Sequence, residues 1–334
     1  MKKIGKQTIE FDNSPSIIST ASIVGPKESN GPLAKYFDKC LDDEFWGEKT
    51  WEKAESKIIR EASNAAVQKS GFSFSDIDYC FAGDLLNQCI SSTFGLRDSN
   101  IPFLGLFGAC STFVESLINA SVFISSNAGE RALCAVSSHF CSAEKQFRFP
   151  LELGNQRPQS SQWTVTGAGA AVLSNQGNGP QITHATVGKI VDMGIKDSNN
   201  MGAAMAPAAL DTLLTHFKDT GRKPSDYDAI FTGDLGHIGK EILTELSELK
   251  GYNIKSNYND CGVLIFDKDS QDTHSGGSGC ACIATVFSGY IYKQMLDKKL
   301  KRVLLIATGA LTNATTVQQG ESIPGIAHAV SIEI

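Results

Sequence analysis

The sequence contains an internal duplication, which restricts the possible folds more than any other feature. The segment SDIDYCFAGDL (residues 75–85) returns as SDYDAIFTGDL (residues 225–235), an offset of 150 at which seven of eleven positions are identical. Each copy follows a stretch with the apolar spacing of an amphipathic helix (51–71 and 206–221) and runs as an apolar strand into Gly-Asp-Leu. Glycine permits a turn at the strand end, and aspartate can accept hydrogen bonds from backbone amides there.

A second correspondence lies farther along the chain, at an offset of 171. Residues 130–139 (ERALCAVSSH) match residues 301–310 (KRVLLIATGA) in pattern, and a helix introduced by small residues precedes each copy. A repeat of this length exceeds a solenoid unit of about 20–50 residues, so we expect two α/β halves of one fold. The Gly/Asn-rich segment 174–181 predicts the boundary, with halves 1–177 and 178–334.

Composition excludes several classes of protein. The net charge of −6 is mild, so a nucleic-acid partner is not expected. The first residues lack the apolar stretch of a signal peptide, and no run of about 18 apolar residues predicts a membrane span. Nine cysteines, an odd number, favour reduced thiols, and their spacing is not that of a zinc site. We therefore expect no metal site and no cofactor.

One cysteine has an unusual position. Cys110 lies between a short apolar run, IPFLGLFG, and a helical pattern made by Phe113, Leu117, Ala120 and Ile124. It is therefore expected on the turn from a strand to a helix, where the helix dipole favours a thiolate and free amides can stabilise an oxyanion. Such a cysteine is either a nucleophile for acyl transfer or a small residue that packs in a tight corner.

The sequence resembles the thiolase superfamily in four features. These are two related halves, the cysteine on the turn of the first half, the segment VTGAGAAVL after it, and HSGGSG in the second half. This resemblance implies a duplicated αβαβα sandwich with Cys110 at the nucleophile position. A closer resemblance, to the stage V sporulation protein AD family of endospore-forming bacteria, rests on motifs in order along the whole chain. They include SIVGPKESNGPLAKYFDK, AGDLLNQ, PFLGLFGACST, EKQFRFP, QWTVTGAGA, MGAAMAPAALDT, RKPSDYD, GGSGCAC and IPGIAH.

The reaction machinery of the superfamily's enzymes is incomplete in this sequence. The asparagine of the ketoacyl synthases aligns with Gly277, and their histidine falls at His237 or Gly236. His274 resembles the thiolase histidine before a Gly-rich turn, but no cysteine follows IATGAL, where thiolases carry their second thiol. We therefore expect a thiolase-like cavity without turnover.

The closer family resemblance implies binding of dipicolinic acid, pyridine-2,6-dicarboxylate, for uptake into the developing spore. A pocket for this flat dianion needs apolar or aromatic faces and donors at two carboxylates. The predicted ligand-binding residues are Cys110, Ser111, His139, Arg148, Trp163, Thr166, His237 and His274. The amides around Cys110 and Ser111 would hold one carboxylate, and Arg148 is the cationic candidate. For the other side chains a purely structural role stays open, and Asp84 is expected to shape the pocket.

The leading hypothesis is thus a non-enzymatic dipicolinate-binding protein, peripheral at the inner spore membrane. The resemblance implies other subunits of a spore membrane channel complex as partners, dipicolinic acid as ligand with or without calcium, and leaves a homodimer open. The alternatives are an acyl-transfer enzyme of the ketoacyl synthase or thiolase type that uses Cys110, and a structural scaffold with a vestigial pocket.

Overall fold

The computed structural model describes residues 1–147 and 157–334. Ten strands make the main path of one sheet, five from each half of the chain. Those of the first half are β3 (Ser16–Val24), β5 (Tyr79–Gly83), β6 (Phe103–Gly105), β7 (Arg131–Ser138) and β9 (Gly167–Ser174). Those of the second are β10 (Gln181–Thr186), β11 (Ala229–Thr232), β12 (Tyr258–Asp260), β14 (Arg302–Ala310) and β15 (Gly325–Glu333).

The strand order is symmetric. It runs β12-β11-β14-β15-β10-β3-β9-β7-β5-β6, so each strand has its counterpart at the same distance from the β10–β3 junction. That junction consists of the single pair Gln181 and Ser16. Short strands complete the molecule: β1 (Lys2–Ile4), β2 (Thr8–Glu10), β4 (Lys39–Cys40), β8 (Trp163–Thr164) and β13 (Gly277–Ser278).

Strand register confirms both predicted sequence correspondences. Cys80 of β5 pairs with Leu133 of β7, and Ile230 of β11 pairs with Leu304 of β14. The offset of 150 relates Cys80 to Ile230, and the offset of 171 relates Leu133 to Leu304. The same offsets relate two loop contacts: Asp78 accepts from the amide of Arg131 at 3.0 Å, and Asp228 accepts from the amide of Arg302 at 2.9 Å. The division of the chain at residue 177, in the linker between β9 and β10, stays a prediction.

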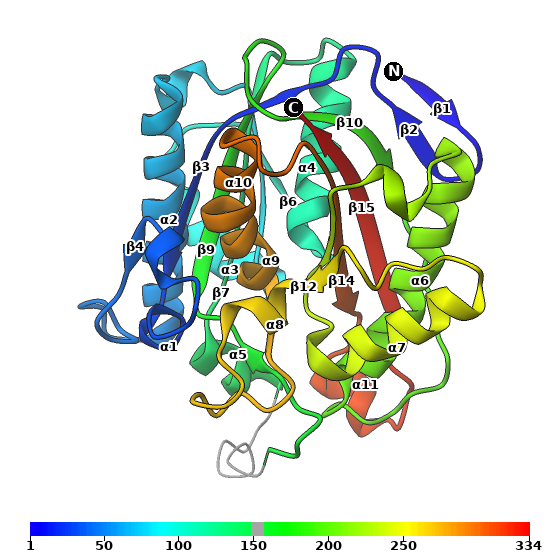
Figure 1. Ribbon diagram of the computed structural model, residues 1–334. Coiled ribbons are helices and arrows are strands. Elements are labelled where there is room, and N and C mark those ends of the chain that lie inside the picture. The colour runs from blue at the N-terminus through cyan, green and yellow to red at the C-terminus, as the bar shows by residue number, and fades with distance from the viewer. Residues whose placement is uncertain (148–156) are drawn as a thin grey trace.

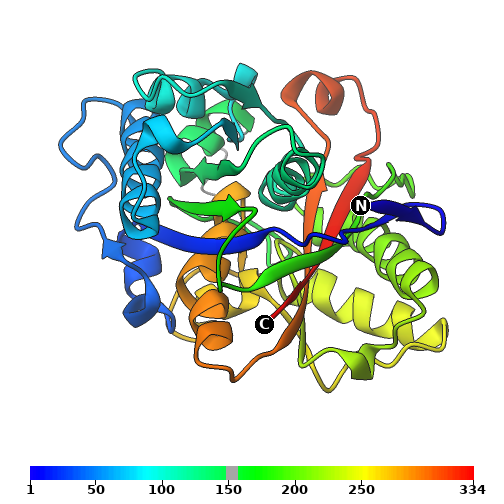
Figure 2. The same ribbon diagram turned by 90° about the horizontal axis from the view of Figure 1, so that it is seen from above.

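Helices form three layers around the two halves of the sheet (Figures 1 and 2). In the middle layer, α4 contacts β5 and β7 of the first half as well as β14 and β15 of the second. The outer helices α2 and α6 pack on the first-half and second-half strands, respectively. The longer helices are α2 (Trp51–Ser70), α4 (Thr112–Ser125), α5 (Phe140–Phe147), α6 (Met201–Thr220) and α7 (Gly236–Leu249). Shorter ones are α1 (Pro26–Ser29), α3 (Ile90–Leu96), α8 (Cys261–Ile265), α9 (Cys280–Val286), α10 (Tyr292–Leu296) and α11 (Ala314–Gln318).

The two outer helices have sequence signals at both ends. Thr50 caps α2 by accepting from the amide of Lys53, and Asn200 caps α6 by accepting from that of Ala203. Both helices stop at a glycine with positive φ, Gly71 at 78° and Gly221 at 69°. In the described part of the chain, no helix has the length and apolar character that crossing a membrane requires.

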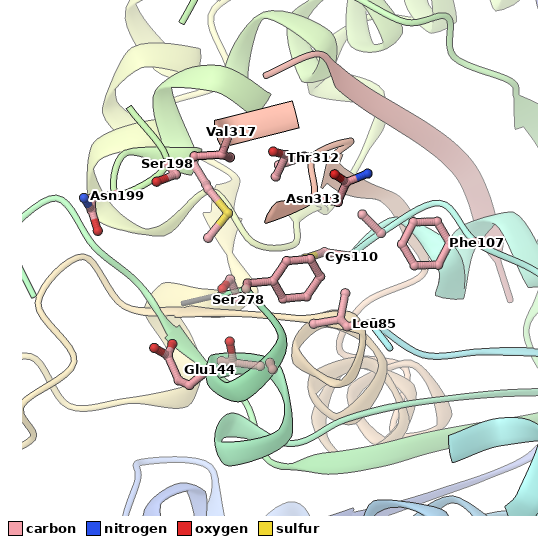
Figure 3. A pocket seen from close by; sticks show the side chains of 16 residues that line it. Leu85, Phe107, Cys110, Glu144, Ser198, Asn199, Ser278, Thr312, Asn313 and Val317 are labelled. Carbon is pink, nitrogen blue, oxygen red and sulfur yellow. The ribbon is translucent and has the colours of Figure 1, made fainter. Parts of the chain in front are cut away.

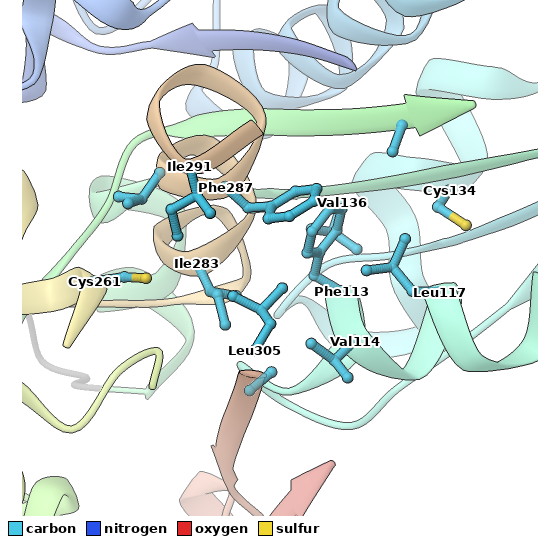
Figure 4. Packing of buried hydrophobic residues seen from close by; sticks show 14 of the residues in the cluster. Phe113, Val114, Leu117, Cys134, Val136, Cys261, Ile283, Phe287, Ile291 and Leu305 are labelled. Carbon is cyan, nitrogen blue, oxygen red and sulfur yellow. The ribbon is translucent and has the colours of Figure 1, made fainter. Parts of the chain in front are cut away.

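The largest hydrophobic cluster fills the space around the middle layer (Figure 4). Phe113 and Leu117 of α4 are fully buried in it, together with Phe287 and Leu305 of the second half. The rings of Phe113 and Phe287 lie 5.8 Å apart between centroids. Burial of these side chains therefore holds the two halves to each other, because each half supplies one wall of the same core.

This packing predicts unequal costs for truncating two phenylalanines. Phe113→Ala should lower the free energy of unfolding by about 3–5 kcal/mol, because it leaves a cavity between the halves. Phe94→Ala is the matched control: Phe94 lies on α3 with 53% of its surface exposed, so the change should stay within about 0.5 kcal/mol. Urea titration followed by circular dichroism measures both, and equal losses would contradict the described core.

Candidate functional site

Cys110 lies on the tight turn that joins β6 to α4, as the sequence predicts. Side chains of the first helical residues hold this turn: Ser111 Oγ donates to the carbonyl of Gly108 at 2.6 Å, and Thr112 Oγ1 donates to that of Ala109 at 2.6 Å. The amide of Gly108 in turn donates to Thr112 Oγ1 at 3.0 Å. Ser111 is fully buried, so its side chain has a structural role in the turn.

A pocket of about 120 Å³ opens beside Cys110, whose exposed fraction is 8% (Figure 3). The first half supplies an apolar wall with one acidic side chain, made by Leu85, Phe107, Ala143, Glu144 and Phe147. The second half supplies a more polar wall, made by Ser198, Asn199, Met201, Thr312, Asn313 and Val317. Both halves therefore contribute to one site.

Two helices begin at this pocket. The first turn of α4 follows Cys110 directly, and α6 begins at Met201, which lines the pocket together with Ser198 and Asn199 just before the helix. The first amides of a helix lack partners within the helix, and the helix dipole gives that end a partial positive charge. The pocket therefore has two features that favour an anion, one from each half.

Cys110 is a neutral thiol in this environment. Burial raises the pKa of the Cys110 thiol well above its ordinary value, and the nearby carboxyl of Asp234 raises it further. The amide of Gly279 acts in the opposite direction but does not reverse the shift. A reactive cysteine needs a lowered pKa, because the thiolate is the nucleophile.

Three predicted site residues, His139, Trp163 and Thr166, do not line the pocket. The Nε2 of His139 donates to the carbonyl of Glu44 at 2.8 Å, and its Nδ1 accepts from the amide of Cys141 at 3.2 Å. Thr166 Oγ1 accepts from the amide of Phe140 at 3.1 Å. The ring of Trp163 stacks on that of Phe140, with centroids 3.6 Å apart, although its neighbour Thr164 lines the pocket.

The two remaining predicted histidines do not line this pocket either. His237 lies in a surface groove with Lys240 and Glu241, and its amide donates to the carbonyl of Ser275 at 2.7 Å. His274 Nε2 lies 2.9 Å from a carboxylate oxygen of Asp272.

Three further positions complete the comparison with the predicted site. Gly277 lies on β13, next to Ser278 of the pocket lining. Arg148 lies outside the described residues. Asp84 is buried and accepts from the amides of Leu86 and Ser92 at 2.9 and 2.8 Å, which holds the segment that includes the pocket residue Leu85.

Of the predicted set, the structure thus brings only Cys110 to the pocket surface, among the residues it describes. Sequence reasoning missed Asn199, Thr312 and Asn313, which come from loops without a recognisable motif. It also missed Asp234, which raises the pKa of Cys110. The repeat contained a signal for this residue, because Asp234 is the counterpart of Asp84.

Among the described residues, no group of three or more His, Cys, Asp or Glu side chains is placed to hold a metal.

Comparisons with known proteins agree on fold and family. The chain has the fold of 3-oxoacyl-[acyl-carrier-protein] synthase III from Aquifex aeolicus (TM-score 0.58, 13% identity, 96% of this chain and 100% of that chain). It is similar to a variant of OleA from Xanthomonas campestris (TM-score 0.62, 13% identity, 97% of this chain and 99% of that chain). These likenesses establish the thiolase-like α/β fold.

In sequence, the chain is 47% identical to Stage V sporulation protein AD of Bacillus subtilis (strain 168) over 333 residues, which cover 100% of this chain and 98% of that protein. The pattern of the Stage V sporulation protein AD family matches residues 5–333. The chain therefore belongs to the Stage V sporulation protein AD family.

Proposed function

We propose that this sporulation protein binds dipicolinate, without turnover, in the pocket beside Cys110, and serves its uptake into the developing spore. The observation that carries the proposal is the convergence of the α4 and α6 N-termini on one pocket whose cysteine is a neutral thiol. Such a pocket attracts an anion and does not attack it.

The lining suits a flat aromatic dicarboxylate. Phe107, Phe147 and Leu85 offer apolar and aromatic surface for the ring. The two carboxylates of dipicolinate project from one edge of the ring and diverge, so two separate groups of donors are needed. The α4 amides serve one carboxylate, and the α6 amides with Asn199 serve the other.

Arg148 keeps its predicted role as the cationic partner of the ligand in this proposal. It follows directly after α5, whose residues Glu144 and Phe147 line the pocket. Calcium as a companion of the ligand stays an expectation from the family resemblance.

The alternative, acyl transfer at Cys110, has the fold in its favour, since the 3-oxoacyl-[acyl-carrier-protein] synthase has the same one. Against it stand the raised pKa of the Cys110 thiol and a described pocket lining that contains no histidine. The described lining therefore lacks the histidine that commonly activates a nucleophilic thiol, and its one acidic side chain is that of Glu144.

We further propose that the protein acts at the inner spore membrane as a peripheral subunit beside other subunits of a membrane complex. This part rests on the family resemblance. A homodimer is part of the same proposal. Phe103 of the edge strand β6 and Phe107 of the segment after it offer apolar surface for it, with 40% and 49% of their surfaces exposed.

Calorimetric titration with dipicolinate tests the site. Cys110→Trp should abolish binding because the indole fills the pocket, whereas Cys110→Ala should weaken it only modestly because the amide donors belong to the backbone. Arg148→Ala should lower affinity about ten- to hundredfold, which is the range for a lost hydrogen bond to a charged group. Unchanged binding by both Cys110→Trp and Arg148→Ala would place the site elsewhere.

Ligand analogues and a competing substrate serve as controls for the same titration. Pyridine-2-carboxylate, which lacks one carboxylate, should bind more weakly than dipicolinate. Acyl-coenzyme A should neither compete nor be turned over, and turnover that Cys110→Ala abolishes would establish the acyl-transfer alternative.

A charge placed at the start of α6 separates binding from stability. Asn199→Asp should weaken dipicolinate binding by about tenfold or more, because like charges at an interface cost several kcal/mol. The same change should leave the melting temperature unchanged or raise it slightly, because an acidic group near a helix N-terminus is favourable. Asn199→Ala is the matched control, with a smaller loss of affinity, and equal affinity of Asn199→Asp and the parent protein would refute the role of α6.

A further inference from the structure

The short helix α5 supplies part of the pocket wall from one of its sides. Ala143, Glu144 and Phe147 line the pocket, and residues three and four apart share one side of a helix. Phe147 belongs to the aromatic surface that a flat ring requires. The position of α5 therefore decides where this part of the wall lies.

The opposite side of α5 faces the long helix α2. Ser142 and Lys145 are three residues apart on this side, and each contacts a glutamate of α2. Ser142 Oγ donates to Glu55 Oε2 at 2.6 Å. Lys145 Nζ donates to Glu52 Oε1 at 2.6 Å. The two glutamates are also three residues apart, so two adjacent contacts join the helices.

These two contacts differ in burial. The side chains of Lys145 and Glu52 are 53% and 30% exposed, and ion pairs in water contribute little to stability. Glu55 and Ser142 are only 1% and 2% exposed. Removing one partner of a buried hydrogen bond leaves the other unsatisfied, which is costly. The bond between Glu55 and Ser142 is therefore the stronger attachment of α5.

The Glu55 carboxyl is itself fixed to the sheet. Its other oxygen, Oε1, accepts from the hydroxyl of Ser137 at 3.0 Å. Ser137 is fully buried on β7, which pairs with β5 on one side and with β9 on the other. One carboxyl therefore connects α5 to an inner strand of the sheet.

The environment of Glu55 favours its neutral form. Burial first, and the nearby carboxyl of Asp84 second, raise the pKa of the Glu55 carboxyl. A neutral carboxyl has one group that donates and one oxygen that accepts, and the side-chain amide of glutamine offers both roles. Glutamine can therefore keep the two serine contacts, whereas methionine, of similar length, can keep neither.

We propose that Glu55 is a positioning residue of the pocket beside Cys110: its carboxyl fixes α5 to β7 and thereby sets the place of Phe147 in the pocket wall. Glu55 is not itself a lining residue, so it acts through α5. The inference rests on the proposed function in one respect, namely that Phe147 contacts dipicolinate.

Hydrogen exchange read by mass spectrometry tests the attachment of α5 without any ligand. The backbone amides of α5 should exchange about three- to tenfold faster in Glu55→Met and in Ser142→Ala, which is the range for one lost hydrogen bond. Glu55→Gln should restore the exchange of the parent protein. Glu52→Gln is the matched control on the same pair of helices and should also match the parent.

Calorimetric titration of the same variants with dipicolinate tests the effect on the pocket. Affinity should fall about three- to tenfold in Glu55→Met and in Ser142→Ala, and it should stay within about twofold of the parent in Glu55→Gln and Glu52→Gln. A side chain that only fills space would be replaced as well by methionine as by glutamine. Circular dichroism verifies that each variant is folded, and Ser142→Ala serves as the test if Glu55→Met does not fold.

Unchanged exchange of α5 in the folded test variants would overturn the proposal. Faster exchange with unchanged dipicolinate affinity would overturn it as well, and so would equal losses in Glu55→Gln and Glu55→Met. Failure of the parent protein to bind dipicolinate would instead refute the proposed function, and the exchange of α5 would then still decide whether Glu55 positions this helix.

Discussion

The packing of α4 between the two halves is the constraint on which the rest of the structure depends. Phe113, Val114, Leu117 and Ala120 of this helix are fully buried, and the helix contacts strands of both halves. Its N-terminal residue Thr112 is fully buried as well. The N-terminal end of the helix, with the partial positive charge of the helix dipole, lies at the pocket beside Cys110, so the central packing of the fold also places a feature that favours an anion there.

The same fold supports condensing enzymes, and a few side chains decide what this pocket can do. A thiolate at Cys110 would be a nucleophile, and it would repel a dianion. Burial raises the pKa of the thiol, and Asp234 adds to the effect. The helix N-termini still favour negative charge in the pocket. In the proposed function, the carboxylates of the ligand supply that charge instead of the thiol. In that function, the local electrostatics favour binding over reaction, because the scaffold by itself does not decide between the two.

The sequence predicts the fold well because the signals of the fold are local or repeated. Apolar runs, helix caps such as Thr50 and the two copies of Gly-Asp-Leu are visible in the sequence, and the strand register follows the two offsets. The lining of the pocket is harder to predict from the sequence. Asn199 and Asn313 come from loops more than 85 residues beyond Cys110, and no local sequence pattern marks them. His139 follows β7 and Thr166 precedes β9, as the sequence predicts. Their polar atoms, however, form hydrogen bonds with the backbone of Glu44 and Phe140. Asp234 shares its motif with Asp84, but it is Asp260 that accepts from the amides of Leu235 and Gly236 after this motif.

A crystal structure of the protein with dipicolinate tests the central claim most directly. The account predicts density for the ligand between the first turns of α4 and α6, with one carboxylate at the N-terminus of α4, the other beside Asn199, and no bond to the sulfur. Density for the ligand in another cavity, or a covalent adduct on Cys110, would contradict it.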